Sequence, residues 1–165
     1  MYAKLPTVLT LLVVLTGGSL FTDVFAQVAN VELVSEFGER GQDPGQFFWP
    51  EKAAVDPAGT IIVADTSNDR IQLCNRECAC TAFGGYGSQP GQFNSPVGID
   101  LDVDGNLVIA DSANNRIQVC DYQGHCRVYT DSSGNEPEIN WPLDLAFDAD
   151  GDLHILNADN YWICP

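Results

Sequence analysis

The sequence is poor in basic residues. Its 165 residues include 7 lysines and arginines against 23 aspartates and glutamates, which gives a net charge of -16 at neutral pH. A protein surface with this charge repels the phosphates of nucleic acids and the headgroups of anionic lipids. The composition therefore excludes nucleic acid and membrane surfaces from the expected partners, and it favours cations, neutral ligands such as glycans, or basic proteins.

Long apolar stretches are also lacking. The one extended apolar run spans residues 5–15, too short to cross a bilayer comfortably, and no second run of spanning length follows. Lys4 precedes this run, and Val24-Phe25-Ala26 offers a small-residue cleavage site before Gln27, an arrangement typical of a signal peptide. We therefore predict a signal peptide over residues 1–26 and a secreted, periplasmic or cell-surface protein, with an uncleaved membrane anchor as the alternative.

The sequence also lacks helical apolar patterns and recognisable groups of catalytic residues. Outside the predicted signal, no stretch of useful length shows the apolar period of a helix. His125 and His154 are the only histidines, and no serine or cysteine has a nearby base in a recognisable arrangement. The sequence thus favours an all-β protein that is not an enzyme.

The most informative feature of the sequence is an internal repeat. DTSNDRIQLC at residues 65–74 recurs as DSANNRIQVC at residues 111–120, a period of 46 residues. A weaker third copy has Asn157 in place of the aspartate and Trp162 in place of the arginine. Other positions align on the same period: Pro50, Pro96 and Pro142; Asp56, Asp102 and Asp148; Gly59, Gly105 and Gly151.

Each repeat carries the signals of four short strands. In the second copy, alternating apolar runs precede and follow a turn at residues 102–105, a third run covers 116–120, and a fourth covers 127–129. Such a unit is a four-stranded antiparallel meander. Repeated meanders of this length are typical of the blades of a β-propeller.

The motif resembles the NHL repeat. The resemblance rests on FG-x-x-G-x-x-PG-x-F-x-x-P, then D-x-x-G, an apolar strand and AD-x-x-N-x-RIQ, and it covers residues 37–165. It implies a propeller family usually built with six blades, with repeats at about 37–82, 83–128 and 129–165. Some NHL propellers are lyases, but no residue here matches their catalytic sites, so a lyase or hydrolase fragment is the weakest functional hypothesis.

The strand count predicts half of a six-bladed ring. In the register of the repeat, residues 31–37 correspond to a stray outer strand, which with the three repeats makes three blades' worth of strands. Three blades cannot close a ring, since propellers typically need four to eight. One hypothesis is that two chains exchange these strands to form a dimer or a filament. The alternative is that the 165 residues are a fragment of a longer protein.

The cysteines predict disulfides. Cys74 and Cys80 recur as Cys120 and Cys126, which selects the pairs Cys74–Cys80 and Cys120–Cys126, while Cys78 and Cys164 remain unassigned. A zinc site is disfavoured, because Cys78-x-Cys80 lacks metal-ligand spacing and has no nearby histidine.

The repeated loop after the second strand is expected to be a scaffold. Asp111 can accept hydrogen bonds at the end of its strand, Asn114 tolerates left-handed turn geometry, and Arg116 can donate to a neighbouring carboxylate or carbonyl. The same structural role is expected for Asp65, Asn68 and Asn160. In a meander this loop shares a face with the long segment GGYGSQPGQFNSP, and that face is the predicted ligand surface.

Aromatic and basic side chains supply the ligand-face candidates. Trp49 and Trp141 occupy the same repeat position, where Ser95 stands in the middle copy. Tryptophans there suit stacking on a sugar ring or a partner's side chain, although large side chains also fill the wedges between blades. The candidates for binding protein or glycan are Trp49, Arg70, Tyr86, Arg116 and Trp141.

No cofactor is expected. Asp100, Asp102 and Asp104 superficially resemble a calcium loop, but their flanks are strands, and the other copies have Ala54 and Ala146 at the first position. An ordinary hairpin turn explains the same residues. The sequence therefore predicts a non-enzymatic exported module for binding or assembly, with a self-assembling structural subunit as the alternative.

Overall fold

The computed structural model describes residues 11–13, 24–26, 37–130 and 134–158. The chain divides into two units, residues 1–36 and 37–165. In the first unit β1 (Leu11–Val13) pairs antiparallel with β2 (Val24–Ala26). Most of the predicted signal peptide, the expected outer strand, Asn160, Trp162 and Cys164 lie outside the described residues. Among the described residues, no helix has the length and apolarity needed to span a bilayer.

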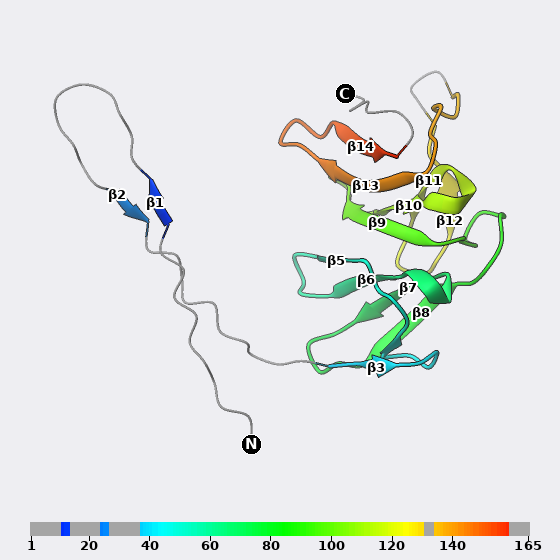
Figure 1. The fold of residues 1–165 in the computed structure, drawn as a ribbon, viewed down its shortest axis with the longest axis horizontal. Coiled ribbons are helices and arrows are strands. Elements are labelled where there is room, and N and C mark those ends of the chain that lie inside the picture. Colours follow the sequence, from blue (N-terminus) through cyan, green and yellow to red (C-terminus); the bar gives the residue numbers. More distant parts are fainter. Residues whose placement is uncertain (1–10, 14–23, 27–36, 131–133, 159–165) are drawn as a thin grey trace. The chain divides into compact units, whose positions relative to one another are not determined.

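The second unit is built from antiparallel sheets that we call blades 1, 2 and 3 (Figure 1). Blade 1 contains β5 (Lys52–Val55), β6 (Ile61–Asp65), β7 (Arg70–Cys74) and β8 (Cys80–Gly84). Blade 2 contains β9 (Pro96–Leu101), β10 (Leu107–Asp111), β11 (Arg116–Cys120) and β12 (Cys126–Val128). The described part of blade 3 contains β13 (Pro142–Phe147) and β14 (Leu153–Asn157). The four-stranded meander predicted from the repeat is confirmed in blades 1 and 2.

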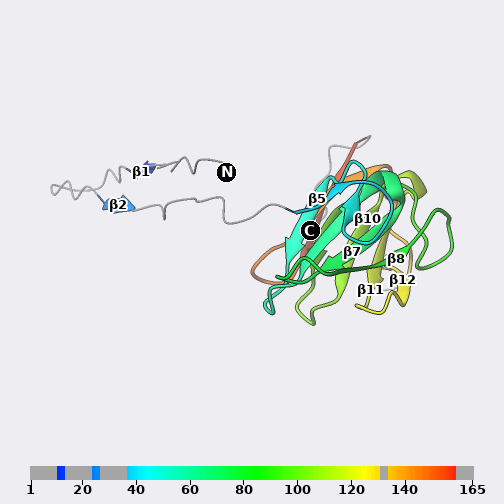
Figure 2. The same cartoon turned by 90° about the horizontal axis from the view of Figure 1, so that it is seen from below.

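The blades stack face to face, with the first strand of each blade beside that of the next (Figures 1 and 2). Alternation along each strand gives every blade two apolar faces. One core lies between blades 1 and 2, and a second lies between blades 2 and 3. The first includes Ile62, Ala64, Ile71, Ile99 and Ile109; the second includes Val108, Ile117, Val119, Leu145 and Ile155.

Phe93 is the largest side chain that is completely buried in the first core. Its ring lies 6.2 Å from that of Phe83. Gly84 has a positive φ of 104°, and the equivalent glycine of the first repeat, Gly38, has a similar φ of 93°. A Cβ at Gly84 would lie 2.6 Å from the Phe93 ring, so a glycine is needed for this contact.

A short parallel pairing was not foreseen from the sequence. β3 (Glu39–Arg40) pairs in parallel with β4 (Gln46–Phe47), and the equivalent residues of the next repeat, Tyr86 and Phe93, form a parallel bridge. These pairings fold the segments that lead into blades 1 and 2 into compact loops. Each loop therefore presents a defined surface.

Both predicted disulfides are present. Cys74 joins Cys80, and Cys120 joins Cys126, so each bond staples the third strand of a blade to its fourth. Cys78 is an exposed free thiol. Disulfide pairs of this kind are typical of an oxidising, extracytoplasmic environment.

Lys52 connects blades that are not neighbours in sequence order. Its ammonium donates to both carboxylate oxygens of Asp144, at 2.9 and 2.8 Å, and so bridges β5 to β13. The position between them is Gly98 of β9, where a Cβ would lie 2.9 Å from the Asp144 backbone. The glycine lets the first strands of the three blades approach one another closely.

Tyr122 ties blade 2 to blade 1 on the face that carries the hairpin turns. Its hydroxyl donates a 2.9 Å hydrogen bond to the Asp56 carboxylate. Desolvation, together with the hydrogen bond to Asp56 and the charge of that carboxylate, raises the pKa of Tyr122 to about 12. Desolvation also acts to raise the pKa of Asp56, but hydrogen bonds from Thr60 and Tyr122 outweigh it and lower that pKa.

We expect Tyr122 to keep its proton until about pH 12, whereas an ordinary tyrosine titrates near pH ~10. Because the folded protein holds this proton more tightly, the stabilisation is fully present below about pH 10 and is lost as the pH rises towards 12. Tyrosinate absorbance during an alkaline titration measures the effect. The Tyr122→Phe variant should lack the tyrosinate absorbance that appears near pH 12, and identical titrations of the two proteins would contradict the assignment.

Candidate functional site

The loop face of the protein is formed by the turns after β6 and β10 and by the long connections that lead into β5 and β9. Each of these two turns contains a short 3-10 helix: η1 (Thr66–Asn68) follows β6, and η2 (Ser112–Asn114) follows β10. Arg116 donates to the backbone carbonyls of Ser88, Gln89 and Gln92 in the long connection. These contacts confirm that the two segments share a face.

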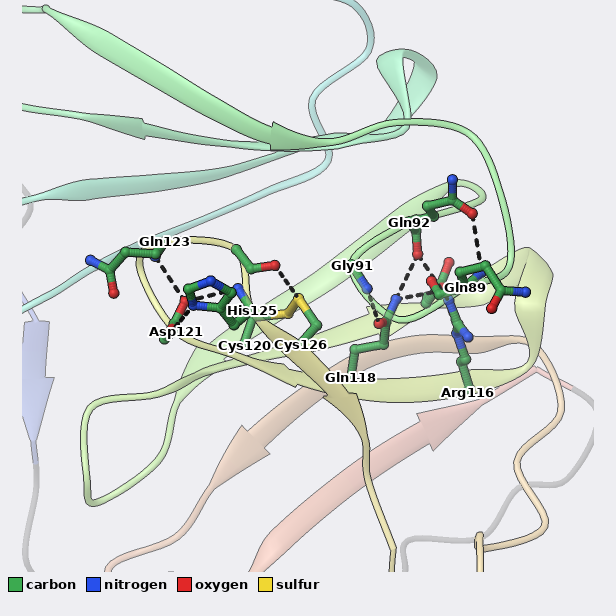
Figure 3. The surroundings of a disulfide bond; sticks show 12 residues. Gln89, Gly91, Gln92, Arg116, Gln118, Cys120, Asp121, Gln123, His125 and Cys126 are labelled. Carbon is green, nitrogen blue, oxygen red and sulfur yellow. Dashed lines mark hydrogen bonds and ion pairs between the residues drawn. A yellow bond between two sulfur atoms is a disulfide. The ribbon is translucent and has the colours of Figure 1, made fainter.

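A buried polar network holds the loop face of blade 2, and Figure 3 shows its outer part, where Arg116 and Gln118 reach Gln89, Gly91 and Gln92 of the long connection. The completely buried Asp111 carboxylate accepts hydrogen bonds from the Asn94 amide at 2.7 Å, the Arg116 guanidinium at 2.7 Å and the Gln118 amide at 3.0 Å. The side chain of Asn114 also donates to Asp111, at 2.9 Å. The sequence of the loop thus specifies a cluster in which one carboxylate satisfies four donors.

Blade 1 repeats the network residue by residue. Asp65 accepts from the Phe48 amide at 2.7 Å, from Arg70 at 2.8 Å and from the side chains of Asn68 and Gln72, both at 2.9 Å. Asp65 is completely buried, like its counterpart in blade 2. The structural role predicted for the repeated loop is therefore visible in both copies.

The two arginines proposed as ligand contacts direct their donors inward. Arg70 donates to Asp65 and to the carbonyls of Gln42, Asp43 and Gln46, as Arg116 does in its own repeat. Their side chains are largely buried, with 14% and 12% of the surface exposed. A ligand on this face would meet the rim of these clusters and not free guanidinium groups.

The third copy of the loop differs at its central residue. Asn157 takes the place of the aspartate and is buried, but its side-chain oxygen has no hydrogen-bond partner among the described residues. Its predicted loop partner Asn160 lies outside the described residues. Among the described residues of blade 3, no buried carboxylate stands at the position that organises the loops of blades 1 and 2.

The left-handed residue of the loop is not the one expected. The sequence suggested Asn114, but Asn115 and the equivalent Asp69 adopt positive φ, at 55° and 53°. These two residues end the short helices, while Asn114 bridges Asp111 to the Gly87 carbonyl. The side chains of Asp69 and Asn115 then accept hydrogen bonds from the next blade, from the amides of Ser95 and Trp141 at 2.8 Å each.

Trp49, Ser95 and Trp141 share an unusual backbone conformation. Their φ values are 48°, 54° and 50°, in the left-handed region that bulky residues rarely occupy. Trp49 is 71% exposed and Trp141 is 50% exposed. Within the described residues, therefore, neither tryptophan is buried between two blades. The structure holds both indoles at the surface of the loop face.

Tyr86 is a third exposed aromatic residue of this face, at 74%. It borders a polar hollow together with Gln42, Ser67, Asn68, Asp69 and Arg70. A second hollow adjoins Trp49 and is lined by Phe37, Glu39, Arg40, Phe47 and Phe48, with the Arg40 guanidinium 4.4 Å from the centre of the Phe48 ring. Two of the aromatic candidates from the sequence, Trp49 and Tyr86, thus lie at the edges of hollows.

Sequence comparison identifies the repeat that builds this face. The model of the family described as "NHL repeat" matches residues 93–120, which run from the buried Phe93 through the Asp111 network to Cys120. The chain contains an NHL repeat. A curated relative, the B-box type zinc finger protein ncl-1 of Caenorhabditis elegans, is 39% identical over 61 residues, which are 36% of this chain and 7% of that protein.

Solved structures show the same blade architecture. A catalytically inactive virginiamycin B lyase from Staphylococcus aureus, with quinupristin, is 16% identical with a TM-score of 0.52; the match covers 64% of this chain and 33% of the lyase. A streptogramin B lyase structure is 13% identical with a TM-score of 0.51, covering 81% of this chain and 54% of that one. A putative gluconolactonase is 16% identical with a TM-score of 0.51, covering 70% and 44%.

These likenesses establish an all-β fold of propeller blades. The chain spans between about a third and about half of the length of the matched structures. The prediction of blades amounting to half of a six-bladed propeller agrees with this coverage.

The aspartates proposed as calcium ligands organise backbone turns of the NHL unit. Asp102 accepts from the amides of Asp104 and Asn106 at 3.0 and 2.8 Å, while Asp100 accepts from the amides of Leu101 and Phe147. Asp121 and Asp148 accept amide hydrogen bonds in the same way in their own hairpins. Within the part of the chain that the structure describes, no group of three or more acidic, histidine or cysteine residues could hold a metal ion.

Each histidine forms a single pair with a turn aspartate. His125 lies 2.8 Å from Asp121, and His154 lies 3.0 Å from Asp148. The hydrogen bond from His125 lowers the pKa of Asp121, and the one from His154 lowers that of Asp148. The Asp121–His125 pair lies in the turn between β11 and β12, whereas the Asp148–His154 pair joins the turn after β13 to strand β14.

Sequence reasoning missed the two glutamines of the RIQ motif. Gln72 and Gln118 are completely buried, and each accepts from a glycine amide and donates to a glutamine carbonyl of the preceding connection. A polar residue repeated between apolar neighbours on a buried strand was the available signal. These glutamines hold the long connection against the third strand of the blade.

Proposed function

We propose that the protein is a non-enzymatic binding module that recognises protein or glycan through its loop face. The observation that carries the proposal is the shared geometry of Trp49 and Trp141. Both are exposed, and both occupy a backbone conformation that costs a bulky residue of order 1–3 kcal/mol. Ser95 takes the same conformation, so the fold does not require tryptophan there.

The chemistry of this surface favours partners that offer apolar or planar faces. An indole provides a large rigid area with one hydrogen-bond donor, which suits a sugar ring or a partner's side chain. Tyr86 adds a hydroxyl beside the hollow that contains Asn68 and Asp69. The net charge of -16 favours neutral glycans or basic protein segments over anionic ligands.

The cellular setting is part of this proposal. The disulfides Cys74–Cys80 and Cys120–Cys126, together with the signal-like sequence at residues 1–26, support a secreted, periplasmic or cell-surface protein. Extracellular glycans and exported proteins are available as partners in each of these places.

The test measures binding of the chain to a panel of neutral oligosaccharides and to a panel of basic peptides. We expect Trp49→Ala and Trp141→Ala each to weaken binding of the recognised panel member at least about tenfold, because each removes a stacking surface. Val103→Ala is the matched control, since Val103 is exposed in a hairpin turn on the opposite face.

A gain-of-function variant completes the design. Ser95→Trp places a third indole at the equivalent position and should tighten binding of an extended ligand that spans more than one blade. Binding to oligosaccharides alone would identify a glycan module, and binding to peptides alone a protein module. If the Trp49→Ala, Trp141→Ala double variant binds as well as the unaltered chain, the loop face is not the binding surface.

A further inference from the structure

The two ends of the blade stack expose apolar surfaces that are buried inside it. On blade 1, Val55 is 62% exposed and Ala53 is also exposed, whereas the equivalent residues of blade 2, Leu101 and Ile99, pack in the first core. We call the exposed surface around Ala53, Val55 and Ile61 the first end face. In blades 2 and 3 the equivalent surface packs against the preceding blade.

Blade 3 exposes the opposite kind of surface. Leu156 is 51% exposed and Leu143 is 43% exposed, whereas the equivalent residues of blade 2, Ala110 and Val97, are buried in the second core. We call the surface around Leu143, Ala146, His154 and Leu156 the second end face. A shallow hollow bordered by Ala146, His154 and Leu156 lies on it.

The end faces are the two halves of one interface. Inside the chain, the surface of blade 1 that is equivalent to the second end face packs against the surface of blade 2 that is equivalent to the first. Blades 2 and 3 pack against each other in the same way. The end faces lie on the outer sides of blades 1 and 3 with blade 2 between them, so they cannot meet within the described stack (Figure 1). The chain therefore carries the complement of each end face, but at its other end.

We propose that a second copy of this chain covers the end faces, with the first end face of one copy packed against the second end face of the other. The packing would repeat the contact already seen between consecutive blades, with apolar side chains of alternate residues interdigitating. Such a head-to-tail contact is heterologous, and two copies of three blades close it into one ring. Burial of these apolar surfaces would drive the association.

Charged substitutions on the end faces test the contact in the whole 165-residue chain. Light scattering should give twice the mass of one chain. Val55→Asp and Leu156→Asp should each weaken association at least about tenfold, because each would place an unpaired charge in an apolar interface. Val103→Asp is the matched control: Val103 is 85% exposed in a hairpin turn, and its substitution should leave the mass unchanged. Circular dichroism checks that all three variants keep their β structure.

Mixing the variants tests the head-to-tail geometry. A Val55→Asp chain retains an intact second end face, and a Leu156→Asp chain retains an intact first end face. An equimolar mixture should therefore recover a dimer through one of the two contacts, although neither variant associates as well alone.

Three results would overturn the proposal. One is a monomer at chain concentrations up to about 100 μM, where even a micromolar interface is mostly occupied. Another is association that Val55→Asp abolishes and Leu156→Asp leaves intact, which would mean that like faces pair. The third is association insensitive to both substitutions. None of these outcomes changes the ligand-binding measurements with Trp49→Ala and Trp141→Ala, so the two proposals fail independently.

Discussion

Replacing Asp111 with alanine should lower the free energy of unfolding by roughly 3–5 kcal/mol, the range for removing one partner of a buried ion pair. The carboxylate is completely buried and accepts four hydrogen bonds, from Asn94, Asn114, Arg116 and Gln118. In the variant, the side chains of Asn114, Arg116 and Gln118 would each still donate to a backbone carbonyl of the preceding connection. The Asn94 amide loses the acceptor that the structure gives it, and the largely buried guanidinium loses its counter-charge.

Urea denaturation of the variant and of two controls measures this effect. Asp65→Ala should be equally costly, because Asp65 makes the same four kinds of contact in blade 1. Asp104→Ala should change the unfolding free energy by less than about 0.5 kcal/mol, since Asp104 is an exposed turn residue. A loss below about 1 kcal/mol for Asp111→Ala would show that the network is not a principal support of the blade.

Replacing Phe93 with alanine should cost about 3–5 kcal/mol, the range for truncating a buried aromatic residue in a core. The ring is completely buried between blades 1 and 2, where it contacts Gly84 and lies near Phe83. Tight packing against a glycine leaves little room for the backbone to collapse into the cavity. The variant should therefore lose both the apolar burial and the contact that joins the long connection to the blade.

The chain contains a matched control for Phe93 in its own first repeat. Phe47 follows the same Pro-Gly-Gln sequence and packs near Phe37, with ring centres 6.0 Å apart, but it is only half-buried. Phe47→Ala should therefore cost clearly less than Phe93→Ala when both are measured by urea denaturation of dilute protein. Equal losses would mean that the inter-blade core contributes nothing beyond packing within one repeat.

The repeat in the sequence predicts those features that depend on local pattern. Strands at β9 to β12 follow from alternating apolar residues, and the Cys120–Cys126 bond follows from its copy at Cys74–Cys80. Hairpins follow from Asp-x-x-Gly turns, as at Asp102. Each of these features is decided within one unit of 46 residues, so comparing copies reveals it.

Features that depend on contacts between units were less accessible. The left-handed conformation of Trp141 depends on a hydrogen bond to Asn115 of the previous blade, and no local signal marks it. The inward direction of Arg116 depends on carbonyls more than twenty residues away. Exposure of Trp49 likewise depends on which neighbours reach it in space. The candidate residues could be named from the sequence, but their orientation needed the fold.

The contact between Lys52 and Asp144 changes how the blades should unfold. In an ordinary linear array of repeats, stability is close to a sum of terms for each unit and its immediate neighbours, so units can be lost one at a time from an end. Here the Gly98 backbone allows a charge in blade 1 to reach blade 3, so fraying of the last blade also removes a partner from the first. Both side chains are more than a third exposed, and such a pair contributes at most about 1 kcal/mol. Even this weak ion pair links blades 1 and 3. It therefore disfavours stepwise loss of blades and favours a single concerted unfolding transition.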